Sequence, residues 1–377
     1  MFLLKRAVSA LWFLILLLPI LAYSDETTHN ANINDILTWS GDFRYRHETT
    51  DMKIDPVHRQ RQRIRFRFGV AAQVSDEFKV NLRLSSGETS NSVSGNQTLG
   101  DSTSGEGESR KVVWLETADF EWKPIQYFSF YGGKFGFPLL ATDLIFSPEL
   151  SYEGGLAKSE FTISKSATMF VNLGESWLRE NAHTNDQGLM LSQFGIRGNC
   201  PDWSYMVGVG YYDFTNVKNQ PLFFKTACGN SVDTVHLGST TYAGYAYDYN
   251  LFNSAVRVEW NRLPVPVAVI GEYVKNTEVT NQNSAWLMGI QIGKAKQKKD
   301  WSLYYSYRVI QKDAAIGSFT EPNFGNGGTS TCGHKVDIEY IPVKNISAAL
   351  HLFDNTIDPD HANVAFKRLQ IEIMFRF

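Results

Sequence analysis

The stretch HRQRQRIRFRFGVAAQV spans residues 58–74, and arginine recurs at every second residue in its first half, from 59 to 67. The five arginines are numbered 59, 61, 63, 65 and 67, and apolar side chains fill the alternate positions from Ile64 onward. On an extended strand, a spacing of two puts the guanidiniums on one face and the apolar groups on the other. Guanidiniums stay charged at any working pH and repel one another unless acids or solute anions lie near. The row therefore predicts a cationic sheet face that needs anionic partners.

Other chemistry is not indicated by the sequence. Cys200, Cys228 and Cys332 are far apart and the eight histidines are scattered, which gives no metal site with the usual ligand spacing. The segment NLGESW at 172–177 lacks the strand-to-helix context of a nucleophile elbow, and no glycine-rich phosphate loop opens a helix. We therefore expect no enzyme, no catalytic or metal-binding residue and no cofactor.

Composition and the N-terminus limit the class of protein. The 377-residue chain has a formal net charge of −3, which implies no nucleic-acid partner. Two basic residues precede an apolar run at 10–21, and the small residues Ala22 and Ser24 follow it. This pattern predicts a cleaved signal peptide at 1–24 and an exported domain at 25–377, because the run is too short for a membrane anchor.

The positioning elements are predicted to be strands. The final stretch RLQIEIMFRF repeats the alternation of the arginine stretch, and no segment after residue 25 shows a convincing helical period. Sixteen strands are expected, at 36–48, 58–74, 78–84, 112–122, 127–135, 153–161, 167–174, 188–198, 203–214, 251–262, 266–275, 284–293, 301–311, 334–341, 345–353 and 368–377.

Connection lengths indicate how these strands are arranged. Short connections of three to six residues alternate strictly with longer ones, such as 86–110, 136–152, 215–250 and 312–333. A transmembrane barrel has short periplasmic turns and long outer loops, whereas a soluble sandwich has no reason to alternate in this way. We therefore expect an all-β fold, an antiparallel up-and-down transmembrane β-barrel of about 16 strands. The apolar faces then meet lipid and the arginines line a wet lumen.

The last strand carries a second functional expectation. Leu369, Ile371, Ile373, Phe375 and Phe377 share its apolar face. A final strand with this alternation that ends in Phe resembles the signal read by the outer-membrane assembly machinery. Phe377 is therefore the expected assembly signal.

The chain resembles the putative porins of Gram-negative bacteria, whose barrels are general diffusion channels. The resemblance spans nearly the whole exported domain. It is carried by GDFRYRHE (41–48), by RQRIRFRFGVAAQVSDEFKVNLRLSSGE (61–88), by GGKFGFPLLATDLIFSPELSYEGG (132–155) and by the segment from Asn283 to Gly328, which begins NSAWLMGIQIGKAKQKKDW. It implies a passive channel in the bacterial outer membrane. The three cysteines depart from the pattern associated with this family.

In such a channel, selection depends on the diameter and on fixed charges. The candidate pore-lining cations are Arg44, Arg46, Arg63, Arg65, Arg67 and Arg83, and their expected partners are Asp42, Glu48, Asp143 and Glu149. The outermost Arg59 and Arg61 could instead contact lipopolysaccharide or solvent at the rim.

The third long loop, 136–152, is unusually apolar, so we expect it to fold into the lumen and present its two acids there. A hairpin packed outside and a surface adhesin loop are the alternatives. The arginines outnumber the acids near the narrowest point, which favours anions.

The cysteines give a test of this topology. Cys228 and Cys332 are expected in long outer loops and Cys200 in a periplasmic turn, a bilayer away. Export makes a disulfide permissible, so any pair should be Cys228–Cys332; three free thiols are the alternative.

Three functions fit the sequence. The leading one is an outer-membrane porin for passive diffusion of small hydrophilic solutes or ions. The others are a barrel-type surface receptor or adhesin with a closed lumen, and a secreted soluble β-protein. Expected partners are outer-membrane lipid and lipopolysaccharide, the solutes, and the barrel-assembly machinery. A homotrimer is expected only by analogy with other sixteen-stranded porins.

Overall fold

The computed structural model describes residues 36–55, 57–88, 94–101, 110–136, 139, 144–182, 185–238 and 240–377. The predicted signal peptide at 1–24 and the candidate Asp143 lie outside these residues. Within the described residues, helices long and apolar enough to cross a membrane are not found.

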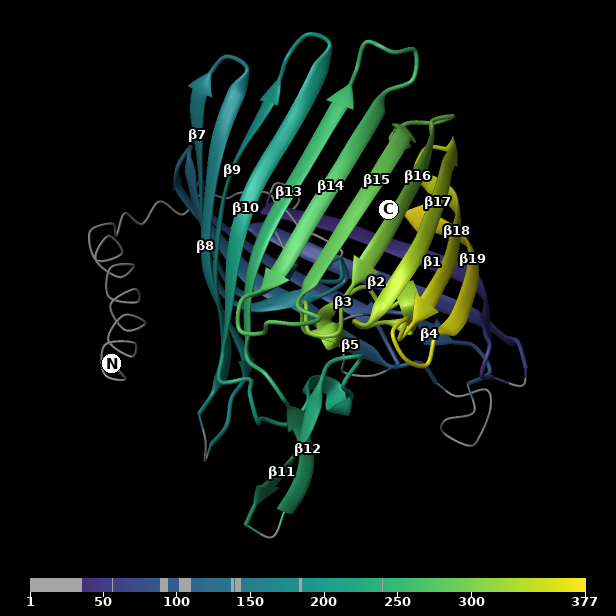
Figure 1. Cartoon of the computed structure of the whole chain (residues 1–377). Helices are drawn as coiled ribbons and strands as arrows, with labels where there is room; N and C mark the ends of the chain where they lie inside the picture. The colour runs from purple at the N-terminus through teal and green to yellow at the C-terminus, as the bar shows by residue number, and fades with distance from the viewer. Residues whose placement is uncertain are drawn as a thin grey trace. The chain divides into compact units, whose positions relative to one another are not determined.

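Sixteen long antiparallel strands form the body of the molecule (Figure 1). They are β1 (Leu37–Met52), β2 (Arg59–Gln73), β3 (Phe78–Ser86), β5 (Val113–Ile125), β6 (Phe128–Gly136), β7 (Ser151–Ser164), β8 (Ala167–Arg179), β9 (Gln187–Asn199), β10 (Trp203–Thr215), β13 (Tyr249–Trp260), β14 (Val267–Asn276), β15 (Ser284–Gly293), β16 (Trp301–Ile310), β17 (Thr331–Val343), β18 (Ile346–Ile357) and β19 (Val364–Arg376). Every strand predicted from the sequence is confirmed.

The sheet closes into an up-and-down barrel. Each long strand pairs with the next one along the chain, and β1 also pairs with β19, which completes the ring. The β1–β19 register sets Phe43 opposite Phe375 and Arg46 opposite Glu372. At the end of this seam, Gly41 and Phe377 exchange two backbone hydrogen bonds of 2.8 and 3.1 Å.

Smaller elements lie in the long connections. The strand β4 (Gln97–Thr98) pairs with β2 beyond the end of β3. The strands β11 (Val232–Leu237) and β12 (Thr240–Tyr245) form a hairpin of their own beyond one end of the barrel (Figure 1). The part of the chain that the structure describes also contains three short 3-10 helices, η2 (Phe223–Lys225), η3 (Gly317–Phe319) and η4 (Phe324–Asn326).

The two faces of the wall differ as the alternation predicts. On β2, the exposed fraction of Arg65 is 4%, whereas that of the next residue, Phe66, is 40%. The same inversion on β1 buries Arg44 and exposes Tyr45. An apolar outer band around the whole sheet would be costly in water but suits the hydrocarbon core of a bilayer.

The interior contains loops as well as wall side chains. We number the long connections in chain order and use three of them: the third loop (137–150), the fifth loop (216–248) and the seventh loop (311–330). In the third loop, Leu144, Ile145 and Phe146 are almost fully buried and belong to one hydrophobic cluster. Phe146 contacts the rings of Phe214 on β10 and Phe319 in the seventh loop. These apolar residues therefore pack against inward-facing side chains.

Candidate functional site

A network of ion pairs lines the lumen along β1, β2 and β19. Because side chains alternate along a strand, Arg44, Arg46 and Glu48 face the same side of β1, and Arg63 and Arg65 do so on β2. All five are buried, with exposed fractions below 9%. The neighbouring strands β1 and β2 thus bring two arginine rows together, as the sequence predicted.

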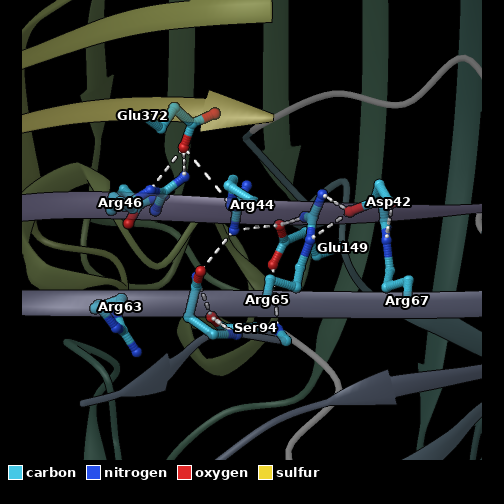
Figure 2. A network of polar contacts seen from close by, with 12 residues as sticks. Asp42, Arg44, Arg46, Arg63, Arg65, Arg67, Ser94, Glu149 and Glu372 are labelled. Carbon is cyan, nitrogen blue, oxygen red and sulfur yellow. Dashed lines mark hydrogen bonds and ion pairs between the residues drawn. The ribbon is translucent and has the colours of Figure 1, made fainter. Parts of the chain in front are cut away.

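Glu149 joins the third loop to this wall (Figure 2). Its carboxylate lies 3.3 Å from the Arg44 guanidinium and also accepts a hydrogen bond from Arg65. Burial alone would raise the pKa of Glu149, but Arg44 and Arg65, helped by Arg46 and Arg67, outweigh it and lower the pKa to about 2. The acid therefore stays charged and holds the loop against the cationic wall.

Asp42 extends the network toward the short turns. It pairs with Arg65 at 2.9 Å and with Arg67 at 2.7 Å (Figure 2). Farther along the wall, Glu116 on β5 lies 3.9 Å from Arg67 and 2.5 Å from Arg83. The charged row thus continues across β3 to β5.

Glu48 extends the network toward the long loops. It pairs with Arg61, lies 3.8 Å from Arg63, and accepts a 2.7 Å hydrogen bond from Gln370. Arg61 therefore contacts an interior acid, whereas Arg59 is exposed at the rim.

Sequence reasoning missed two acids of the site. Glu372 lies directly opposite Arg46 and pairs with it at 2.6 Å, and it lies 3.6 Å from Arg44 (Figure 2). The sequence could have predicted Glu372 as a partner of the arginines on the first strand. A closed barrel must pair its last strand with its first, and Glu372 lies on the polar face of the last strand. Glu116 has no comparable signal, because its partners depend on the register between β3 and β5.

The charges within this network do not cancel. Its cations are Arg44, Arg46, Arg61, Arg63, Arg65, Arg67, Arg83 and Arg368, and its carboxylates are Asp42, Glu48, Glu88, Glu116, Glu149 and Glu372. Eight arginines against six carboxylates leave a formal excess of two positive charges.

Two cavities flank the middle of the network. The first, of 240 Å³, is lined by Arg63 and residues of the second, fifth and seventh loops. The second, of 280 Å³, is lined by Gly69, Ala71 and Arg83, closer to the short turns. Arg65 lies between Arg63 and Gly69 on β2, so the layer of Asp42, Arg44, Arg65 and Glu149 separates the cavities.

The cysteines correct one sequence prediction. Cys332 lies within strand β17, not in a long loop, and all three cysteines are free thiols. Alternation puts Cys332 on the outward face with exposed His334, whereas Cys228 lines the 240 Å³ cavity. Opposite faces of the wall keep the two thiols apart, so the geometry does not support their pairing. Cys200 follows β9 in a short turn, as predicted.

Among the described residues, no group of three or more His, Cys, Asp or Glu side chains could hold a metal ion.

The closed barrel and its charged interior define the class of the protein: a transmembrane β-barrel with a polar lumen. The chain matches the family model described as putative porin over residues 47–237 and 223–377, so it belongs to the putative porin family. Among curated protein sequences, none matches the chain.

Solved porin structures share the fold. OprB of Pseudomonas putida is 9% identical, with a TM-score of 0.58 over 92% of this chain and 95% of that one. A Salmonella typhi OmpF complex with daunomycin is 10% identical, with a TM-score of 0.54 over 92% and 99%. A loop-deletion mutant of OmpT, an outer membrane protein of Vibrio cholerae, is 13% identical, with a TM-score of 0.51 over 91% and 100%. At these identities the similarity supports the fold alone.

Family and fold together make this chain an outer-membrane porin, a channel for passive diffusion of small hydrophilic solutes in the bacterial outer membrane. They favour this function over the closed surface receptor and the secreted β-protein.

Proposed function

We propose that Asp42, Arg44, Arg65 and Glu149 form the constriction of the porin and that the constriction favours small anions. Arg46, Arg63, Arg67, Arg83 and Glu48 extend its charged wall on either side. Asp143, the remaining candidate, belongs to the same loop as Glu149.

The contact of Glu149 with Arg44 and Arg65 carries this proposal. It brings a segment of the third loop against the cationic wall at the level that separates the two cavities. Arginines on the wall facing an acid on the loop create a transverse field across the lumen. Such a field orders water and favours small charged or dipolar solutes over apolar ones. The excess of two positive charges in the network favours anions.

The test is to replace Arg65 and Arg67 together by alanine in the full-length protein. We expect a higher single-channel conductance, because two long side chains leave the lumen, and a reversal potential shifted toward cations in a salt gradient. The shift should shrink near 1 M salt, where the screening length falls to about 3 Å.

A matched control replaces Arg262, a turn residue whose side chain is 80% exposed, by alanine. It should leave both readouts unchanged. Unchanged conductance and reversal potential in the double variant would mean that Arg65 and Arg67 do not line the constriction. Heat-modifiable migration on gels verifies that each variant is folded.

We further propose how the porin reaches and occupies the membrane. Residues 1–24 act as a signal peptide that is cleaved on export, and the barrel-assembly machinery reads the final strand. The exposed Arg59 lies where lipopolysaccharide phosphates can reach it. A homotrimer is the proposed assembly, and cross-linking in native membranes would reveal it.

A further inference from the structure

The seventh loop also turns inward, which the sequence did not predict. Phe319 and Phe324 have exposed fractions of 5% and 2%, and both belong to the interior hydrophobic cluster. The backbone amide of Ser147 in the third loop donates a 2.6 Å hydrogen bond to the carbonyl of Phe319. The two loops therefore pack against each other inside the barrel.

Charged side chains fix the seventh loop to the wall. Glu321 pairs with Arg308 at 2.7 Å and with Lys335 at 2.8 Å. Burial opposes ionisation of Glu321, but Lys335 and Arg308 outweigh it and lower its pKa to about 2. Arg368 donates to the carbonyls of Pro322 and Asn323, both at 3.2 Å. These contacts hold the middle of the loop beside β16, β17 and β19.

The fifth loop fixes its other side. The Asn230 amide donates to the carbonyls of Lys312 and Ala315 at 2.9 and 2.7 Å, and its oxygen accepts from the Gly317 amide at 2.7 Å. A Cβ atom at Gly317 would overlap the Cys228 carbonyl, so only glycine permits this approach. The seventh loop is thus held in a fixed position and forms part of the wall of the lumen.

The 240 Å³ cavity lies between this wall and the arginine row. One side is lined by Arg63, Glu88, Ser94 and Asn96, and the other by Thr320 and Asn326 of the seventh loop. With liquid water taking about 30 Å³ per molecule, the space holds about eight waters. It therefore suits a small solute, and its lining combines Arg63 and Glu88 with hydroxyl and amide side chains.

Arg63 is the cation of this cavity, and its hydrogen-bonding capacity is under-used. The exposed fraction of Arg63 is only 8%. Its two ion pairs are long, with nitrogen–oxygen distances of 3.8 Å to Glu48 and 3.5 Å to Glu88. Its Nε is buried and has no hydrogen-bond partner among the described residues, as is also the case for Arg44, Arg61 and Arg83. Glu88 is engaged elsewhere, because it accepts hydrogen bonds from the backbone and side chain of Thr98. A solute anion would supply the acceptor that Arg63 lacks.

We infer that this cavity is a binding subsite for small hydroxylated carboxylates, in series with the constriction. Arg63 takes the carboxylate, since a guanidinium matches its geometry in a bidentate manner. Ser94, Asn96, Thr320 and Asn326 surround the hydroxyl groups. The inference rests on the proposed function, because a solute reaches this cavity only along an open lumen.

Gluconate block of the current through single channels tests the inference. The full-length protein is reconstituted in planar bilayers in potassium chloride, and potassium gluconate or the neutral sorbitol is added. Gluconate should block reversibly and sorbitol should not. Arg63→Gln should weaken the block about tenfold, since a hydrogen bond to a charged group is lost. Asn326→Ala, at an exposed loop position, should weaken it about threefold.

Arg59→Gln is the matched control, because Arg59 belongs to the same row but is exposed at the rim. Gluconate should block the current through the Arg59→Gln channel as strongly as it blocks the current through the parent channel. Equal effects of gluconate and sorbitol, or an unchanged block in Arg63→Gln, would overturn the inference. If Arg63→Gln forms no channels, the block in Asn326→Ala decides instead. The proposal of the constriction is tested by a different result. It is contradicted if the double variant of Arg65 and Arg67 keeps the conductance of the parent.

Discussion

At the scale of single residues, the lumen is organised around shared carboxylates. Asp42 bridges Arg65 and Arg67, and Glu149 bridges Arg44 and Arg65. Removing Glu149 therefore takes one acid from each of two buried arginines, which leaves Glu372 as the partner of Arg44 and Asp42 as the partner of Arg65. Loss of a partner at a buried charge is costly, so the removal of one shared acid weakens the pairing of two arginines at once.

Glu149 provides a pH test of this arrangement. Its pKa is lowered from 4.5 to about 2 by the arginines, so its stabilisation of the docked loop is complete above pH 4.5. It declines as pH falls from 4.5 and is lost below about 2. We expect single-channel conductance to be flat from pH 7 to 4.5 and to change between 4.5 and 2.

The Glu149→Gln variant should show a smaller step, because its side chain cannot titrate, whereas Glu321, whose pKa is also lowered to about 2, still does. At pH 7 its conductance should already differ from that of the parent, since the amide cannot neutralise Arg44 and Arg65. A variant that matches the parent at pH 7 and shows the same acid transition would show that another group is responsible.

At the scale of elements, strands and loops differ in how far sequence determines them. All sixteen strands were predictable, because an amphipathic strand in a two-sided wall shows a period of two. The polarity of β2, with Arg65 inside and Phe66 outside, followed from the same period. The inward packing of the seventh loop was not predictable, since it depends on Asn230 and Arg368, which are distant in sequence. Glu116 was missed for a similar reason.

The seam between the first and last strands yields a prediction about assembly. Phe377 exchanges backbone hydrogen bonds with Gly41, and Phe43 and Phe375 contact each other across the seam at a ring separation of 6.3 Å. Deleting Phe377 should lower the amount of protein in the outer membrane several-fold and cause periplasmic degradation. Quantitative blotting of the membrane and periplasmic fractions measures the amount of the protein in each.

Tyr340→Ala is the control for this deletion, because Tyr340 is another exposed aromatic on the outer face, on β17. It should leave abundance near that of the parent. Equal abundance after deletion of Phe377 would mean that the end of β19 is dispensable for assembly.

At the scale of the whole molecule, the interior has two unlike halves. Charged side chains lie along β1, β2, β3, β5 and β17 to β19. The hydrophobic cluster joins the third, fifth and seventh loops to inward residues of β6, β7, β9, β10 and β13 to β16, and it includes Phe353 on β18. A sixteen-stranded barrel is wide enough for an aqueous channel, but here loops fill the apolar half. Water and solutes should therefore pass along the charged half.

Two alanine positions distinguish the halves. Ala71 on β2 lines the 280 Å³ cavity, and Ala285 on β15 is fully buried in the hydrophobic cluster. Each is replaced by cysteine in a background where the three native cysteines are serine, and a charged, membrane-impermeant thiol reagent is added during recording. The reagent should modify Ala71→Cys and reduce its current, and it should leave Ala285→Cys unchanged over the same period. Equal modification of both would show that water fills the lumen uniformly and that the loops do not confine the path.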